Sequence, residues 1–256
     1  MTLLALAGCP HSPIARTYPA PPPADLVAHV NARADDVPAL KAETRTDVRV
    51  GKDRANVTVY IWAVRGGKLR FQAMNPNETL AADLASDGVG FCFLDTHANC
   101  GACGRATPEN VARLIRIPLE PDEVVSVMLG GAPMLPDETP QVVWDDREGR
   151  EILTLDAEGW TEKVILDGRD KRWDLIEAEM KDPQGKLYWR VRHKDFRVAK
   201  ATDGKVVRLP GASLFEKGDD KVRIEWREQT IADPPPDKTF RLEMPPGLAE
   251  CGGIEK

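Results

Sequence analysis

The sequence lacks the marks of most enzymes and of nucleic-acid-binding proteins. It contains no Walker, Rossmann or GxSxG pattern, and the spacing of its residues supports no Ser/His/Asp set or catalytic carboxylate pair. Lys and Arg, 35 together, are outnumbered by 41 Asp and Glu, and a net charge of −6 does not attract nucleic acid or anionic lipid. We therefore expect a protein that is not an enzyme, binds no nucleic acid, and holds no cofactor or metal.

Long hydrophobic runs are also missing. Beyond the N-terminus no stretch approaches the roughly 20 apolar residues that cross a bilayer. With 42% hydrophobic and 30% charged residues, the 256-residue chain has the composition of a globular protein with a sizeable core.

The short apolar run at the N-terminus ends on a cysteine. Leu6-Ala7-Gly8-Cys9 matches a bacterial lipobox, in which small residues precede the cysteine that receives diacylglycerol and palmitate. No Lys or Arg precedes Cys9, so we expect the natural start to lie upstream. We predict a residual signal peptide at 1–8 and a lipid anchor on Cys9; the alternative is an ordinary apolar N-terminus with a chance Gly-Cys.

Residues 10–23 contain six prolines. Such a segment is extended and semi-rigid, as expected of a tether behind a lipid anchor. We therefore divide the chain into a tether at 9–24, a folded domain at 25–245 and a C-terminal tail at 246–256.

Four cysteines remain once Cys9 is set aside: Cys92, Cys100, Cys103 and Cys251. In an exported protein an even number predicts disulfides, here two, with three possible connectivities. We prefer Cys103–Cys251 and Cys92–Cys100. The alternatives are a zinc site that includes His97, or free thiols.

Hydrophobic periodicity predicts a mainly β protein. Residues 25–41 read as an amphipathic helix, 57–64, 68–74 and 89–95 as strands, and two short helices begin at Pro108 and Pro121. From residue 141 the chain alternates apolar and polar residues, as in 187–194 and 221–228. About eleven strands in meander order predict a large curved antiparallel sheet with one face covered by the three helices.

This order resembles the LolA/LolB-like lipoprotein-carrier superfamily, in particular a LolB-like outer-membrane lipoprotein. The stretches KLRFQAMNP (68–76), LAADLASDGVGF (80–91) and RLIRIPLEPDEVVSVMLGGAP (113–133) carry the resemblance. It implies an unclosed half-barrel with a hydrophobic cavity under a helical lid, which binds acyl chains or lipoproteins. One departure is the loop Asn75-Pro76-Asn77-Glu78, which lacks the exposed leucine of the family's lipoprotein receptor.

The resemblance also implies which residues line the cavity and where the protein resides. Pro10, rather than Asp, follows Cys9, and by the sorting rules of such lipoproteins this favours the periplasmic face of the outer membrane. We expect a monomer; a structural lipoprotein with a filled cavity is the alternative. The candidate lining residues are Trp62, Phe71, Phe91, Phe93, Leu114, Val125, Met128, Trp189 and Trp226. The inward parity of 57–64 is uncertain, because Val59 and Ile61 alternate with Tyr60 and Trp62.

Overall fold

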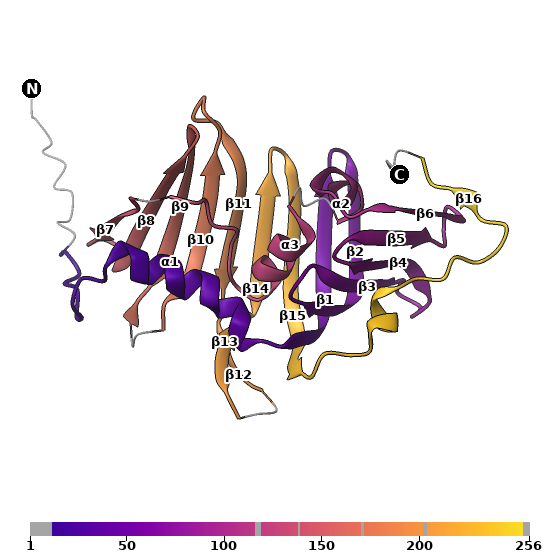
Figure 1. Ribbon diagram of the computed structural model, residues 1–256, viewed down its shortest axis with the longest axis horizontal. Coiled ribbons are helices and arrows are strands. Elements are labelled where there is room, and N and C mark those ends of the chain that lie inside the picture. The colour runs from indigo at the N-terminus through magenta and orange to yellow at the C-terminus, as the bar shows by residue number, and fades with distance from the viewer. Residues whose placement is uncertain (1–11, 116–118, 138, 170–171, 202–203, 253–256) are drawn as a thin grey trace, which may run out of the picture.

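A single long antiparallel sheet, curved but not closed, forms the body of the protein (Figure 1). The computed structural model describes residues 12–115, 119–137, 139–169, 172–201 and 204–252. The sheet has 14 strands in the order β16-β6-β5-β4-β3-β2-β1-β15-β14-β11-β10-β9-β8-β7, and a separate hairpin, β12-β13, projects from it. The mainly β class and the open curved sheet are thus confirmed.

The strands have the following bounds: β1 Ala39–Val50, β2 Asp53–Val64, β3 Lys68–Met74, β4 Leu80–Asp87, β5 Gly90–Asp95, β6 Cys100–Arg105, β7 Gln141–Asp145, β8 Arg150–Ala157, β9 Trp160–Asp167, β10 Asp174–Lys181, β11 Leu187–Lys194, β12 Arg197–Lys200, β13 Val206–Leu209, β14 Ala212–Lys217, β15 Asp220–Ala232 and β16 Ala249–Glu250. Neighbours in the sheet are mostly neighbours in the chain, except where β1 pairs with β15, β11 with β14 and β16 with β6.

The helices are short and lie on one face of the sheet. They are α1 (Pro23–Ala32), which continues into the 3₁₀ turn η1 (Arg33–Asp36), α2 (Pro108–Ile115) and α3 (Pro121–Met128). Figure 1 shows α1 lying across the strands of one half of the sheet and α3 over its middle. The first helix is shorter than the expected 25–41, because residues 39–41 already belong to β1.

Alternation of side chains decides which face is buried. In β8 and β9 the residues Leu153, Leu155, Val164 and Leu166 are fully buried, while the residues between them are partly exposed. The inner face therefore forms the core with the helices, and charged pairs such as Arg190–Glu179 lie on the outer face.

The segment before α1 is packed on the sheet and does not stand off as a free tether. The N–H of Ile14 donates to the carbonyl of Asp146, and the guanidinium of Arg16 makes a bidentate pair with Glu151 at 2.8 and 3.0 Å. The ring of Tyr18 meets those of Trp144 and Trp173 edge to face. The expected tether at 9–24 thus differs from the structure in residues 14–18.

Replacing Arg16 by Ala is expected to destabilise the fold by about 2–3 kcal/mol, because the Glu151 side chain is completely buried and would lose its charged partner. The free energy of unfolding in urea measures this effect. Arg227→Ala is the matched control, since the pair between Arg227 and Glu43 is exposed and is expected to contribute less than about 0.5 kcal/mol. Equal losses in the two variants would contradict the assignment of a stabilising role to the docked segment.

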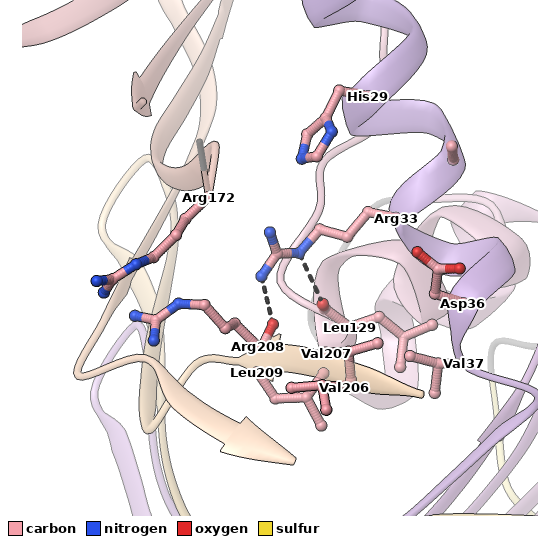
Figure 2. A pocket seen from close by; sticks show the side chains of 11 residues that line it. His29, Arg33, Asp36, Val37, Leu129, Arg172, Val206, Val207, Arg208 and Leu209 are labelled. Atoms are coloured by element: carbon pink, nitrogen blue, oxygen red, sulfur yellow. Dashed lines mark hydrogen bonds between the residues drawn. The ribbon is translucent and has the colours of Figure 1, made fainter. Parts of the chain in front are cut away.

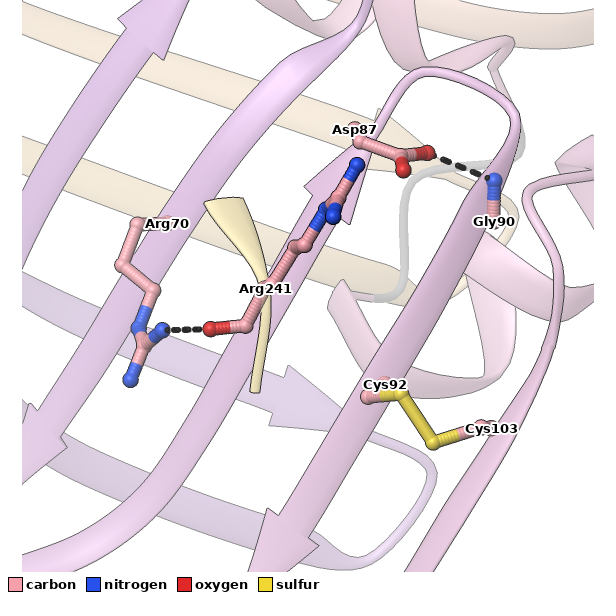
Figure 3. The surroundings of a disulfide bond; sticks show 6 residues. All are labelled: Arg70, Asp87, Gly90, Cys92, Cys103 and Arg241. Carbon is pink, nitrogen blue, oxygen red and sulfur yellow. Dashed lines mark hydrogen bonds between the residues drawn. A yellow bond between two sulfur atoms is a disulfide. The ribbon is translucent and has the colours of Figure 1, made fainter. Parts of the chain in front are cut away.

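The C-terminal segment covers the outer face of strands β3 to β6. Its 3₁₀ turn η3 (Asp237–Phe240) buries Phe240, and Arg70 on β3 donates to the carbonyls of Thr239 and Arg241 (Figure 3). The chain then adds β16 to the sheet edge, parallel to β6. Within the expected C-terminal tail at 246–256, residues 249–250 thus belong to the sheet as β16.

Two disulfides are present, as predicted, but the preferred pairing was wrong. Cys92 bonds to Cys103, and Cys100 bonds to Cys251. The physical reason is that residues 100–105 form a strand rather than a loop, which places Cys103 directly opposite Cys92 (Figure 3). Cys100, the first residue of β6, lies next to the C-terminal segment and bonds to its Cys251.

Candidate functional site

The inner face of the sheet is mostly apolar. A row of directly paired, buried residues crosses six strands of it: Leu153, Val164, Ala178, Val191, Phe215 and Val222. Trp189 and Trp226 stand on the same face with 1% and 2% of their surfaces exposed. The cover over this apolar surface determines whether the surface can bind a ligand.

Three segments provide the cover, which we call the lid: α1, α3 and residues 129–137. Leu26 and Val30 of α1 and Val124, Val125 and Met128 of α3 are buried in the same core cluster as the sheet. Helices of ten and eight residues are not stable alone in water, so the lid depends on this contact. Burial of each large aliphatic side chain supplies about 1.5–3 kcal/mol.

Hydrogen bonds fasten the lid to the sheet at separate points. The carboxylate of Asp122, in the first turn of α3, accepts the N–H groups of Gly66 and Gly67 at 2.7 and 3.2 Å. Both glycines have positive φ, the backbone conformation of the turn between β2 and β3. The N–H of Leu135 donates to Glu162 Oε2 at 2.7 Å. These bonds join the lid to opposite halves of the sheet.

A third fastening runs through a buried polar chain. Trp226 Nε1–H donates to Ser213 Oγ at 3.0 Å, His193 Nδ1 lies 2.9 Å from the same oxygen, and His193 Nε2 lies 3.2 Å from the carbonyl of Gly131. All donors are used if Ser213 donates to Nδ1 and Nε2–H donates to Gly131. Burial lowers the pKa of His193 to about 4, so the ring is neutral near pH 7. The Ser213 hydroxyl is thereby engaged inside the core.

Glu162 is an ionisable residue on the inner face of the sheet, and it lies directly under the lid. Its side chain is fully buried, Oε1 has no hydrogen-bond partner, and only the Leu135 N–H contacts Oε2. Burial, with a smaller contribution from Glu123, raises the pKa of Glu162 to about 8 against the opposing effect of the Leu135 N–H. Glu162 is therefore mostly protonated at neutral pH.

Most of the predicted lining residues lie on the inner face or in the lid. Phe71, Phe91 and Phe93 share a face with Ile61 and Leu84 through direct cross-strand pairing. Phe91 is buried and Phe71 packs against the core. The structure also brings together Val125, Met128, Trp189 and Trp226 in one cluster. Their role in ligand binding stays a prediction.

The structure differs from the prediction for Trp62. Val59, Ile61 and Ala63 are the buried residues of β2, so Trp62 has the opposite parity and lies on the outer face, where Lys41 Nζ stands 5.6 Å from the ring centroid. The reason is the one-residue ambiguity of a strand that is apolar on both faces. The Leu114 side chain and Cys9 lie outside the described residues.

The described cysteines beyond Cys9 are all in disulfides, which removes the thiolates that the zinc alternative requires. Within the described ranges, no group of three or more His, Cys, Asp or Glu residues is arranged to hold a metal ion. Among the helices that the structure describes, none is long and apolar enough to span a membrane.

Comparisons with known proteins define the fold. Neither a protein-family model nor a curated protein sequence matches the chain. Two crystal structures are similar to it: a LolA superfamily protein from Nitrosomonas europaea (TM-score 0.55, 12% identity, 84% of this chain and 97% of the other) and a DUF1329 family protein from Desulfovibrio piger (TM-score 0.56, 11% identity, 86% and 95%). The chain thus shares the fold of a LolA superfamily protein, which is the fold that the resemblance in sequence implied.

Sequence reasoning missed the polar groups under the lid. The alternation of 160–167 carried a signal for Glu162, because Glu162 shares its parity with Val164 and Leu166. His193 likewise shares its parity with Trp189 and Val191. Their partners could not be read from the sequence, because Leu135 and Gly131 belong to a segment without periodicity.

Proposed function

We propose that this protein is an envelope lipoprotein that binds acyl chains, free or as part of lipoproteins, between the lid and the inner face of the sheet. Cys9 anchors it to the periplasmic face of the outer membrane, and it acts by binding rather than by catalysis. The observation that carries the proposal is a mostly apolar face covered by short segments that have no stability of their own. An acyl chain gains about 0.8 kcal/mol for each buried CH₂, so it can replace the contacts that the lid gives up.

An entrance beside the lid supports this proposal. A cavity of about 260 Å³ opens between α3 and residues 132–134, and Val125 and Met134 are among the residues that line it. Its volume is just below that of common ligand sites, so a long chain needs the lid to move outward. Asp122 also lines the cavity and holds the near end of α3.

A second candidate is a structural lipoprotein whose core stays closed. The observation that favours it is the tight contact of the lid, since Val124 and Val125 have no exposed surface. The two candidates differ in whether the lid opens for an acyl chain.

Replacing Met128 by Glu is expected to reduce the affinity for a dansyl-labelled fatty acid more than tenfold, because an unpaired charge under the lid costs several kcal/mol in a dry site. Fluorescence titration measures the affinity, and near-ultraviolet circular dichroism reports whether the sheet keeps its packing. Val143→Glu is the control, since Val143 is exposed at the far edge of the sheet. If wild type does not bind the probe at all, the structural candidate is correct.

Asp122→Ala tests the lid without disturbing the core. Loss of its two hydrogen bonds is expected to weaken the hold on α3 by about 1 kcal/mol and to accelerate probe exchange about fivefold, while the unfolding free energy falls by no more than the same amount of about 1 kcal/mol. Stopped-flow fluorescence measures exchange. An unchanged rate would show that α3 is not the gate.

A further inference from the structure

A second cavity opens at the edge of the lid and differs in chemistry from the apolar face. It has a volume of about 240 Å³ and lies between the end of α1, the end of α3 and the base of the hairpin β12-β13 (Figure 2). His29 and Arg33 reach it from α1 and η1, and Arg208 reaches it from β13. The volume suits a headgroup rather than a whole lipid.

Positive charge exceeds negative charge in this cavity. Asp174 binds the guanidinium of Arg208 through both carboxylate oxygens, at 3.2 and 2.9 Å, and lies 3.7 Å from that of Arg33. One carboxylate is thus shared by two guanidinium groups. Asp36, the acid that lines the cavity itself, pairs with Lys205 at 2.6 Å.

Arg33 is held in place before any ligand arrives. Its side chain is 12% exposed, and its guanidinium donates to the carbonyls of Arg208 and Leu129 (Figure 2). Burial, with the nearby Arg208 charge acting in the same direction, lowers the pKa of Arg33 in spite of Asp174. A buried guanidinium that shares its counter-ion is a place where an added anion is stabilised.

Apolar residues line the rest of the cavity. Leu129 and Leu209 are buried in its wall, and Val206 is 59% exposed at its lip. Leu129 directly follows α3, so the apolar wall continues into the lid. The cavity therefore offers a charged part and an apolar part side by side.

We propose that this cavity binds the phosphate or carboxylate head of an anionic amphiphile, with Arg33 and Arg208 as the groups that contact the anion and Leu129 and Val206 along the first carbons of its chain. The contact with a chain rests on the proposed function, whereas the contact with the anion rests on the cavity itself. The proposal places the head at the edge of the lid and the chain toward the inner face.

Isothermal titration calorimetry of the full chain with decyl phosphate, inorganic phosphate and the uncharged detergent decyl maltoside tests the proposal. We expect saturable binding of decyl phosphate that is at least tenfold tighter than that of either other compound. Equal affinity for inorganic phosphate would overturn the proposal that the ligand is an amphiphile, and would instead indicate a site for a free anion. Equal affinity for decyl maltoside would overturn the anion contact.

Two variants locate the site. Val206→Glu adds a negative charge at the exposed lip and is expected to weaken decyl phosphate binding about tenfold; Val143→Glu, an equally exposed position in β7, is the matched control. Arg208→Gln removes one cation and keeps a donor for Asp174, and a similar loss is expected. Unchanged affinity for decyl phosphate in both Val206→Glu and Arg208→Gln would refute the assignment of the binding site to this cavity.

The test separates the two proposals. If Met128→Glu abolishes binding of the labelled fatty acid and Val206→Glu leaves decyl phosphate binding intact, the inference fails while the proposed function stands. A dansyl-labelled fatty alcohol carries no charge and therefore reports on the acyl contact alone. If wild type binds decyl phosphate through Arg208 but does not bind this alcohol, the anion site stands and the acyl-binding function fails.

Discussion

Replacing Glu162 by Gln is expected to abolish the loss of stability that we expect of the wild-type protein between pH 6.5 and 8. The pKa of Glu162 is raised from 4.5 to about 8 in the folded state, so in this range the folded protein holds a proton that the unfolded chain has released. Stability then falls as pH rises, by at most about 1.4 kcal/mol per pH unit and about 2 kcal/mol over the whole range. Gln is neutral at every pH and keeps an oxygen for the Leu135 N–H.

The window above pH 6.5 isolates this effect. His193 has the opposite sign, since its lowered pKa, about 4, makes the folded state lose stability as pH falls below the unfolded value of 6.5. Below pH 6.5 the two groups partly cancel, whereas above it the unfolded chain loses the rest of its His193 protonation within about one pH unit, an effect that wild type and Glu162→Gln share.

Urea denaturation at pH 6.5, 7, 7.5 and 8 measures the difference between wild type and Glu162→Gln. The control is Glu225→Gln, an exposed glutamate on β15 that faces away from the core. If wild type and Glu162→Gln lose the same free energy over this range, Glu162 is not protonated in the folded protein. We expect the unfolding free energy to fall more steeply with pH in wild type than in Glu162→Gln, because ionised Glu162 weakens the attachment of residues 129–137.

Strong alternation made the return half of the sheet predictable. In 187–194 and 221–228 every second residue is apolar, and Trp189, Val191 and Trp226 are buried as expected. The proline starts of α2 and α3 were also confirmed. These features depend on local geometry, which neighbouring residues specify.

Features that depend on distant partners were not predictable. CGACGR at 100–105 carries no alternation of apolar and polar residues, so β6 escaped notice and the disulfide pairing with it. The described part of the protein has more strands than the expected eleven for the same reason: β16 and the two strands of the separate hairpin β12-β13 are too short to show a period. Tyr18 packs on Trp144 and Trp173, more than a hundred residues away along the chain, which no local pattern could reveal.

The candidate site was predicted in outline and not in detail. The sequence predicted that apolar residues of the lid and the sheet lie together, because the helical and strand periodicities each produce an apolar face that must be covered. The cation-lined cavity was not, because Arg33 and Arg208 become neighbours only after α1 crosses the sheet and β12-β13 folds back (Figure 2).

Replacing both Cys100 and Cys251 by Ser is expected to lower the free energy of unfolding by about 4–5 kcal/mol, the largest effect that we expect from removing any covalent or polar link. The two residues are 151 positions apart, so their bond restricts a long loop of the unfolded chain. In the chain-entropy view the stabilisation grows with loop length. The Cys92–Cys103 bond closes a separation of 11, and its double Ser variant is expected to lose about 2–3 kcal/mol.

Of the two disulfides, only Cys100–Cys251 also ties the C-terminal segment to the sheet. Without Cys100–Cys251, β16 keeps the backbone pairing of two residues with β6, and the covering of β3 and β4 by η3 depends on Phe240 and the bonds from Arg70. Trypsin should then cleave after Arg241 much faster than in wild type, whereas the Cys92→Ser/Cys103→Ser protein should resist cleavage there because its C-terminus remains tied. Urea denaturation of both double variants, prepared in an oxidising compartment, gives the free energies. Equal cleavage rates, or a larger loss for the shorter link, would mean that the outer cover is held by its side-chain contacts and not by the disulfide.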